Sequence, residues 1–212
     1  NDMKITAIIL SKNEEKNIGR CLESIKNQTY PMEKIEIIVV DNNSTDKTKE
    51  IAKLFHGLSV KLFNKGPERS AQRNYGIERA KGEYILFLDA DMSLSERVIE
   101  ECVYKFKDQK SKIKDNKSEL VGLYIPERIL GNSYWCKVRD FERSFYNATV
   151  IDCMRFFPKK VWLEVGGFDE NLTGPEDWDF DKKARMKGVV DIIKSSLCHN
   201  EADFSLNDYL KG

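Results

Sequence analysis

The sequence contains few of the residues from which nucleophilic catalytic sites, zinc sites and disulfide frameworks are built. Only two of its 212 residues are histidines, so a Ser-His-Asp or Cys-His mechanism has little to draw on. Its five cysteines are odd in number and widely spaced, without a Cys-x-x-Cys pair, which argues against zinc and against structural disulfides. This cysteine usage predicts a reducing, cytoplasmic location.

Two further absences restrict the partners of the chain. Basic and acidic residues number 35 each, and this zero formal net charge argues against a nucleic-acid partner. No apolar run approaches the roughly 20 residues that cross a bilayer. No signal peptide is recognisable, because the chain leads directly into an apolar run at 3–10, and Asn1 and Asp2 are interpreted as additions ahead of Met3.

Strand-like and helix-like segments alternate through the first half of the chain. The apolar runs that predict strands are 5–10, 35–40, 59–63 and 84–88, and helical patterns occupy 15–27, 45–55 and 70–80. This order predicts an α/β fold with a Rossmann-like, mostly parallel central sheet flanked by helices. Because neither a repeat nor a linker interrupts the pattern, we expect residues 1–212 to form a single domain.

The segment 87–91 contains the strongest functional signal. Asp89 and Asp91 follow a buried strand, where two neighbouring carboxylates repel each other unless a cation compensates them. Oxygen ligands favour Mg²⁺ or Mn²⁺, and a metal held by one or two carboxylates keeps positions open for the phosphates of a nucleotide. His199 suits a third protein ligand, although a lone histidine is more often structural. In the alternative interpretation, both aspartates cap a helix that begins near Ser95.

Polar residues also follow the other predicted strands, at the sheet edge where ligands bind in this fold class. Residues 11–14 follow the first strand, and Asp41 ends the second, where it suits hydrogen bonding to a nucleobase. Asp46 is interpreted as a helix cap. Arg69 and Arg73 lie in the third helical pattern, where they either face phosphates or belong to a solvated helix surface.

A second acidic segment lies nearer the C-terminus. The glycine-rich stretch 166–170 is followed by 174–180, in which Pro175 suits the first turn of a helix. Glu176 and Asp177 in that turn would stabilise the helix dipole. Three carboxylates and a tryptophan after a glycine-rich loop exceed what a cap requires, and a carboxylate at this position suits a general base.

Taken in order, these motifs resemble the family-2 glycosyltransferases with a GT-A fold. The matching segments are Ile8–Glu15, Val39–Asp46, Arg73–Ile77, Gly82–Asp91 and Gly166–Glu170 with Glu176-Asp177. Each segment is weak alone, but five in family order make the resemblance specific over nearly the whole chain. It implies an inverting, metal-dependent transfer of a sugar from a nucleotide-diphosphate sugar to an acceptor hydroxyl, in polysaccharide, glycolipid or glycoprotein glycan synthesis.

The resemblance also implies a role for each matched residue. Asp177 is the implied catalytic base, supported by Glu176, and Asp91, Asp89 and His199 are the implied ligands of Mn²⁺ or Mg²⁺. The implied donor-binding residues are Ser11, Asn13, Glu14, Asp41, Asn43, Arg73, Asp89 and Ala90, with Asp41 on the base. UDP is the expected donor nucleotide, and GDP is the alternative.

Three departures from the family pattern bear on these implications. Lys12 lies where the first motif usually reads Pro-x-Tyr-Asn, and Asn42 and Asn43 replace the Asp-Gly of the second motif. A Gln-x-x-Arg-Trp motif is not visible, so we predict addition of a single sugar. The alternatives are a sugar-phosphate nucleotidyltransferase, which should have a glycine-rich loop after the first strand, a glycoside hydrolase with paired carboxylates, and a non-catalytic nucleotide-sugar binding module.

The segment 134–146 mixes aromatic and basic residues. Val138, Phe141 and Phe145 share one helical face, and the favoured interpretation is a helix packed on the core. In the alternative, this helix lies on the acceptor side near a lipid surface. A lipid-linked acceptor, rather than a soluble glycan, would then make the protein peripheral to the cytoplasmic face of the membrane.

Overall fold

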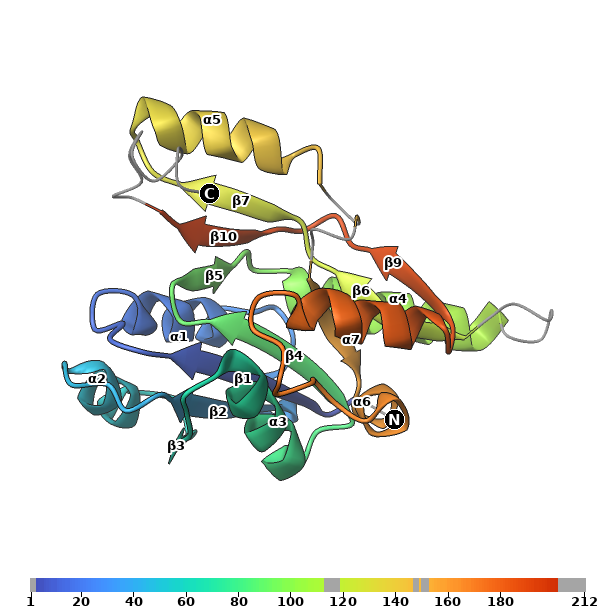
Figure 1. Ribbon diagram of the computed structural model, residues 1–212, viewed down its shortest axis with the longest axis horizontal. Helices are drawn as coiled ribbons and strands as arrows, with labels where there is room; N and C mark the ends of the chain where they lie inside the picture. Colours follow the sequence, from blue (N-terminus) through green and yellow to red (C-terminus); the bar gives the residue numbers. More distant parts are fainter. Residues whose placement is uncertain (1–2, 113–118, 147–148, 150–152, 202–212) are drawn as a thin grey trace.

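The fold is built around a seven-stranded mixed sheet, seen in a computed structural model that describes residues 3–112, 119–146, 149 and 153–201 (Figure 1). In spatial order its strands are β3 (Val60–Asn64), β2 (Ile35–Asp41), β1 (Ile5–Ser11), β4 (Tyr84–Asp89), β8 (Met154–Pro158), β6 (Leu120–Tyr124) and β9 (Val189–Ile192). The four N-terminal strands run parallel, as predicted, and β9 is parallel to β6. The antiparallel insertion of β8 between β4 and β6 was not predicted.

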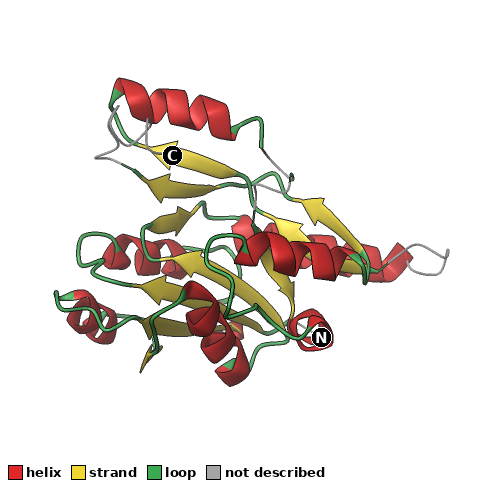
Figure 2. Cartoon of the chain, viewed as in Figure 1, coloured by secondary structure: helices red, strands yellow, loops and turns green. Residues whose placement is uncertain are grey.

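Helices cover both faces of this sheet (Figure 2). One apolar cluster joins the sheet to α1 (Ile18–Lys26), α2 (Thr48–Leu54) and α4 (Val98–Lys112). The other joins it to α3 (Arg69–Arg79), α6 (Lys159–Val165) and α7 (Glu176–Arg185). Because both faces are covered, every residue of β1 is buried, which explains why the strand is an almost unbroken apolar run.

A smaller sheet lies beside the main one and contributes to the candidate site. Its strands, in the order β5 (Met92–Leu94), β10 (Leu197–Asn200) and β7 (Glu127–Leu130), are covered on the β7 side by α5 (Tyr134–Arg143) (Figure 1). Strand β10 pairs antiparallel with β5, with His199 opposite Met92. This register brings His199 next to Asp91, which is 108 residues away in the sequence.

The predicted helix boundaries differ from the structure at their starts. Helix α1 begins at Ile18 because the chain first makes a turn in which the Asn17 and Ile18 amides donate to the Glu14 carbonyl. Helix α2 begins at Thr48, with Lys47 rather than Asp46 at the N-cap position. Asp46 lies one residue earlier, and its carboxylate accepts from the amide and the hydroxyl of Thr48, so it closes the turn that leads into the helix. The single-domain interpretation stays a prediction.

The 3₁₀ turn Met32–Lys34 leads into β2.

Among the residues that the structure describes, none of the helices is both long and apolar enough to pass through a bilayer.

Candidate active site

A cavity of about 600 Å³ lies where β1 and β4 end, beside the first turns of α3 and α7 and next to β10. Most of the predicted site residues line it, namely Ser11, Glu14, Asp89, Ala90, Asp91, Glu176, Asp177 and His199. Parallel strands that end at one edge of a sheet bring such distant segments together. The volume is within the roughly 300–1,000 Å³ of small-molecule sites.

Asp91 and His199 form the polar pair at one wall of this cavity. The His199 Nε2 atom lies 3.0 Å from Asp91 Oδ2, and the Asn200 amide donates to the Asp91 carbonyl. Burial alone would raise the pKa of Asp91, but the hydrogen bond from His199 keeps it below its ordinary value. Burial likewise opposes charge on His199, yet its bonds to Asp91 and Glu127 raise its pKa to about 10. The cap interpretation is therefore wrong for Asp91.

The same wall offers oxygen atoms that fit a divalent cation. Asp91 Oδ1 is buried and has no hydrogen-bond partner among the described residues, and Asp89 lines the same cavity. No three His, Cys, Asp or Glu side chains in the described part of the chain are already arranged as a metal site. Mg²⁺ is commonly held by one or two carboxylates together with substrate phosphates, so this donor set fits a metal that is completed by a bound diphosphate.

Asp177 lies on the opposite wall and is paired with the buried Arg73 behind it. The Arg73 Nη1 and Nη2 atoms donate to Asp177 Oδ1 and Oδ2 at 2.6 and 3.3 Å, and Nη1 also lies 3.5 Å from Glu176 Oε1. The Arg73 side chain is 2% exposed and lies over the rings of Phe87 and Phe168. Arg73 is therefore neither on a solvated helix face nor on the cavity wall, and it orients the predicted base from behind.

The start of α7 holds Glu176 and Asp177 in different environments. The Glu176 side chain is 6% exposed and its Oε2 accepts from the Gly174 amide at 2.7 Å, which closes the turn before the helix. The Asp177 side chain is 23% exposed and reaches the cavity. Each carboxylate oxygen has two acceptor positions, so the pairing with Arg73 leaves Asp177 able to accept a further hydrogen bond from the cavity.

Asp41 lies behind the cavity wall, with all of its surface buried. Its Oδ1 accepts from the hydroxyls of Ser11 at 2.9 Å and Ser44 at 2.5 Å, and its Oδ2 accepts from the Ser44 amide at 2.7 Å. These bonds join the ends of β1 and β2. The structure thus shows Asp41 positioning Ser11, while its contact with a nucleobase stays a prediction.

Asn13 and Asn43 shape the loops beside the cavity. Both residues have positive φ angles, 56° and 53°, which asparagine adopts more readily than most residues. The Asn13 amide donates to Ser44 Oγ at 2.8 Å, and Asn13 Oδ1 accepts from the Thr45 amide at 2.9 Å. The neighbouring Glu14 lines the cavity, and burial raises its pKa. Ligand contacts of Asn13 and Asn43 stay predictions.

The cavity wall also contains residues that the sequence did not single out as ligands. Lys12 and Asn42, noted as departures from the family pattern, line it together with Gln72 and Thr173. The side-chain Nε2 of Gln72 donates to the Val40 carbonyl at 2.8 Å and so holds α3 against the ends of the strands. No local pattern marks Gln72 or Thr173, because each reaches the cavity only through the packing of its segment.

A buried charge cluster behind His199 was also missed. Glu127 of β7 is 5% exposed and contacts His199, Arg143 and Arg155. Burial would raise the pKa of Glu127, but the hydrogen bond from His199 and the two guanidinium groups lower it to about 2. Strand β7 alternates buried and exposed residues, and a glutamate in such a strand normally reads as solvent-facing.

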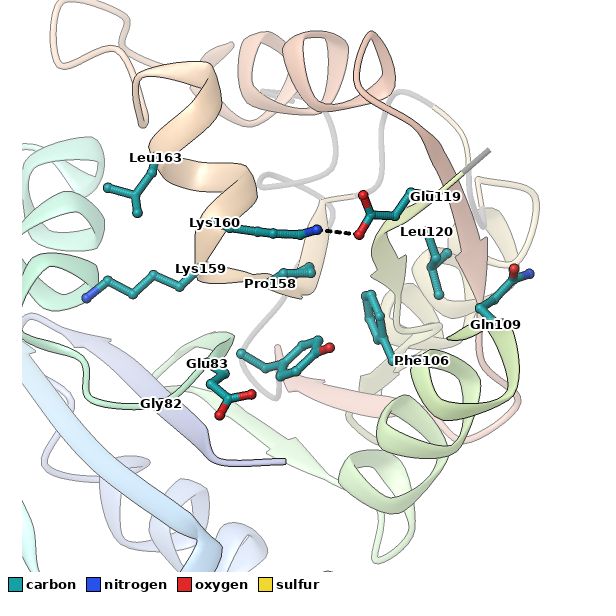
Figure 3. Close-up of a pocket in the computed structure, with 11 residues that line it drawn as sticks. Gly82, Glu83, Phe106, Gln109, Glu119, Leu120, Pro158, Lys159, Lys160 and Leu163 are labelled. Carbon is teal, nitrogen blue, oxygen red and sulfur yellow. Dashed lines mark hydrogen bonds and ion pairs between the residues drawn. The ribbon is translucent and has the colours of Figure 1, made fainter. Parts of the chain in front are cut away.

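A second cavity, of about 420 Å³, lies at the opposite edge of the main sheet (Figure 3). Its apolar walls come from Tyr84, Phe106, Leu120 and Pro158, and the Lys160 ammonium pairs with Glu119 at its rim. None of the predicted site residues lines it. It therefore has no part in the chemistry considered for the first cavity.

Helix α5 packs only part of its surface. Cys136 is buried, and the helix lies against β7. Phe141 of α5 and Phe145, which lies just beyond the end of the helix, are 68% and 66% exposed and touch each other edge to face. The favoured interpretation, in which this aromatic face packs on the core, is therefore wrong for both phenylalanines.

Residues 6–165 match the family described as Glycosyl transferase family 2, and the chain belongs to this family. It is 40% identical over 103 residues to the glycosyltransferase AglE of Haloferax volcanii, a match covering 47% of this chain and 34% of AglE. It is 34% identical over 165 residues to the glycosyltransferase GlyA of Streptococcus pneumoniae, which covers 74% of this chain and 23% of GlyA. The chain thus spans about a third or less of these curated relatives.

Solved structures confirm the predicted GT-A fold. The crystal structure of S. aureus TarS superposes on 99% of this chain and 38% of TarS with a TM-score of 0.69 and 22% sequence identity. The mannosyltransferase PcManGT from Pyrobaculum calidifontis, solved with GDP-Man and Mn²⁺, covers all of this chain and 60% of its own length with a TM-score of 0.70 and 22% identity. TarS has also been solved with UDP and with UDP-GlcNAc.

Proposed function

We propose that this chain transfers a single sugar from a nucleotide-diphosphate sugar to an acceptor hydroxyl, with inversion at the anomeric carbon. One observation carries the proposal: a single cavity joins the Asp89-x-Asp91 segment and His199 on one wall to Asp177 on the other. The first wall suits a diphosphate with its cation, and the second suits proton transfer from an acceptor. Membership in a family of glycosyltransferases supports both assignments.

In this mechanism Asp177 is the general base. It accepts the proton of the acceptor hydroxyl while the hydroxyl oxygen attacks the anomeric carbon from the face opposite the nucleoside diphosphate. The new bond between oxygen and carbon forms as the bond to the leaving phosphate oxygen breaks, and the diphosphate leaves with the electron pair. Arg73 orients Asp177, and Glu176 holds the turn in which Asp177 lies.

Asp91, Asp89 and His199 are the residues that would hold Mn²⁺ or Mg²⁺. A bound divalent cation supplies positive charge that stabilises the negative charge of the departing diphosphate. The unpartnered Asp91 Oδ1 supports this role most directly. The His199 Nε2 atom lies 3.0 Å from Asp91 Oδ2, and a nitrogen that binds a metal must carry no proton.

UDP is our preferred donor nucleotide and GDP the alternative. The solved complexes of TarS with UDP and of PcManGT with GDP-Man support one choice each. Ser11, Glu14, Lys12 and Asn42 line the cavity where the nucleoside would lie. The acceptor is proposed to be a glycan or a lipid-linked molecule of the cell envelope, as the teichoic acid name of a related Bacillus subtilis protein suggests.

We also propose a cytoplasmic protein that touches the membrane peripherally. Exposed aromatic side chains support this contact: Tyr134 and Phe141 on α5, and Phe145 just after the helix ends. Aromatic residues next to an exposed lysine such as Lys137 suit the interface between lipid head groups and acyl chains.

A thermal-shift screen tests the donor site. UDP-, GDP- and dTDP-sugars are each added with and without Mn²⁺ to the wild-type chain, because a ligand that binds only the native state raises its melting temperature. We expect a metal-dependent shift with one nucleotide. Asp91→Ala should remove the metal dependence, whereas Glu119→Gln, which removes one carboxylate at the opposite edge of the sheet, should keep it. A shift that Asp91→Ala leaves intact would refute the metal role.

A further inference from the structure

The two carboxylate oxygens of Glu127 contact different partners. Oε1 lies 3.1 Å from His199 Nδ1, within hydrogen-bond distance. Oε2 lies 2.7 Å from Arg143 Nη2 and 3.6 Å from Arg155 Nη2. The side chain is therefore fixed on one side by two guanidinium groups and presents its other oxygen to the imidazole. Glu201 Oε1 also approaches Nδ1, but at 3.7 Å it is outside hydrogen-bond range.

From this geometry we propose that Glu127 is a positioning residue. It fixes the His199 ring so that Nε2 faces Asp91 and the cavity. The proposal deepens the proposed function and rests on it only for the identity of the metal and donor. Held by a carboxylate at each nitrogen, the ring can neither flip nor rotate without losing a charge-assisted hydrogen bond. In metal sites, such outer partners set which ring nitrogen faces the metal.

The anchors of Glu127 connect the site to two further elements. Arg143 belongs to α5, so the helix with the exposed aromatic face contacts the group that holds His199. Arg155 belongs to β8, and its Nη1 lies 3.9 Å from Asp89 Oδ2. Arg155 therefore contacts both the group that orients His199 and the other predicted metal ligand. A substitution at Glu127 should therefore change the surroundings of both Asp89, through Arg155, and Asp91, through His199.

Nitrogen-15 NMR of the histidine rings tests this role without any metal. The chain has only two histidines, so His199→Gln assigns the ring signals directly. In the metal-free wild type we expect a hydrogen-bonded Nδ1 proton on His199 that exchanges slowly with water. Glu127→Gln keeps an acceptor oxygen and should retain this signal. Glu127→Ala should lose it, and Glu201→Gln, which alters the more distant carboxylate beside the same nitrogen, should keep it.

Glu127→Asp provides a second test if Glu127→Ala does not fold. Aspartate keeps the charge that faces the two arginines but is one methylene shorter, so it cannot bridge Arg143 and His199 together. We expect a folded protein that has lost the slow Nδ1 proton. If the His199 signals of Glu127→Asp and of any folded Glu127→Ala equal those of the wild type, the proposal is overturned.

Mn²⁺ binding, measured by electron paramagnetic resonance in the presence of UDP and, separately, of GDP, gives the functional readout. Loss of an outer-shell partner typically weakens metal binding roughly 10–100-fold, and we expect a change of this size for Glu127→Asp and a smaller one for Glu127→Gln. Equal affinities of the wild type and Glu127→Asp would count against the proposal. If the wild type itself binds no Mn²⁺, the proposed metal role fails, while the NMR result on the metal-free protein still decides the role of Glu127.

Discussion

Replacing Arg73 by methionine would measure how strongly the buried guanidinium holds the predicted base. The Arg73 side chain is 2% exposed and its guanidinium pairs with Asp177, so the substitution leaves that carboxylate and the nearby Glu176 without their cation. Removing one partner of a buried pair costs about 3–5 kcal/mol of unfolding free energy. Because the Asp177 side chain is 23% exposed, water will solvate part of the carboxylate charge that is left unpaired. We therefore expect the free energy of unfolding to fall by about 3 kcal/mol, at the lower end of that range.

Urea denaturation at pH 7, followed by circular dichroism, gives this free energy, and α3 itself supplies a matched control. Arg79 lies six residues further along the helix, with side-chain exposures of 37% for Arg79 and 58% for its partner Glu78. Arg79 also donates to the Tyr75 carbonyl and lies over the Tyr75 ring, a contact that the methionine side chain can keep in part. The same substitution, Arg79→Met, should therefore cost less than about 1 kcal/mol. Sugar transfer by Arg73→Met should fall as well, because Asp177 loses its orientation.

Two results would refute this reasoning. The first is an Arg73→Met variant that is no less stable than Arg79→Met. The second comes from a double-mutant cycle with Asp177→Asn, in which contacting residues show coupling energies of roughly 0.5–3 kcal/mol. Destabilisations that simply add would mean that the pairing of Arg73 with Asp177 contributes nothing to the native state.

Three further predictions concern the base, the core and α5. Asp177→Asn should lower the transfer rate by roughly 10²–10⁴ while the thermal shift with donor persists, and lost donor binding with unchanged transfer would contradict the base assignment. Gly82→Ala places its Cβ 2.5 Å from a backbone nitrogen of β1, so we expect the free energy of unfolding in urea to fall by about 1–3 kcal/mol. An unchanged urea midpoint would show that the backbone of Gly82 does not pack tightly against β1. The double substitution Phe141→Ser with Phe145→Ser should abolish cosedimentation with anionic vesicles at an unchanged urea midpoint, and equal cosedimentation of wild type and variant would exclude α5 as the membrane contact.

The sheet edge and the acidic segments were predictable because their signals are local. The apolar runs of β1, β2 and β4 each end in a polar residue, and the parallel order predicts that these ends share one edge. Asp89 is the last residue of β4 and Asp91 lies two residues beyond it, so the end of the apolar run locates both carboxylates. The start of α7 at Glu176 follows from a proline and a cluster of acids, which act within one helical turn.

The partners of these residues were not predictable. Arg73 meets Asp177 across 104 residues, and His199 meets Glu127 across 72. A helical period identifies the residues that share a face but not the segment that packs against it, so Arg73 reads equally well as a solvated residue. The antiparallel insertion of β8 likewise depends on pairing between strands, which leaves no mark in the composition of either one.

The sequence by itself therefore determined the α/β class, the family, and the ends of strands and helices at which chemistry is expected. Only the tertiary structure decided that Asp41 is enclosed by Ser11 and Ser44, and that Arg73 orients Asp177 from behind the cavity wall. It also decided that Glu127 orients one nitrogen of His199. The physical reason is that the apolar periodicity of a strand or helix is encoded within a few neighbouring residues, whereas buried charges are tolerated only where the whole fold brings opposite charges and hydrogen-bond donors to them.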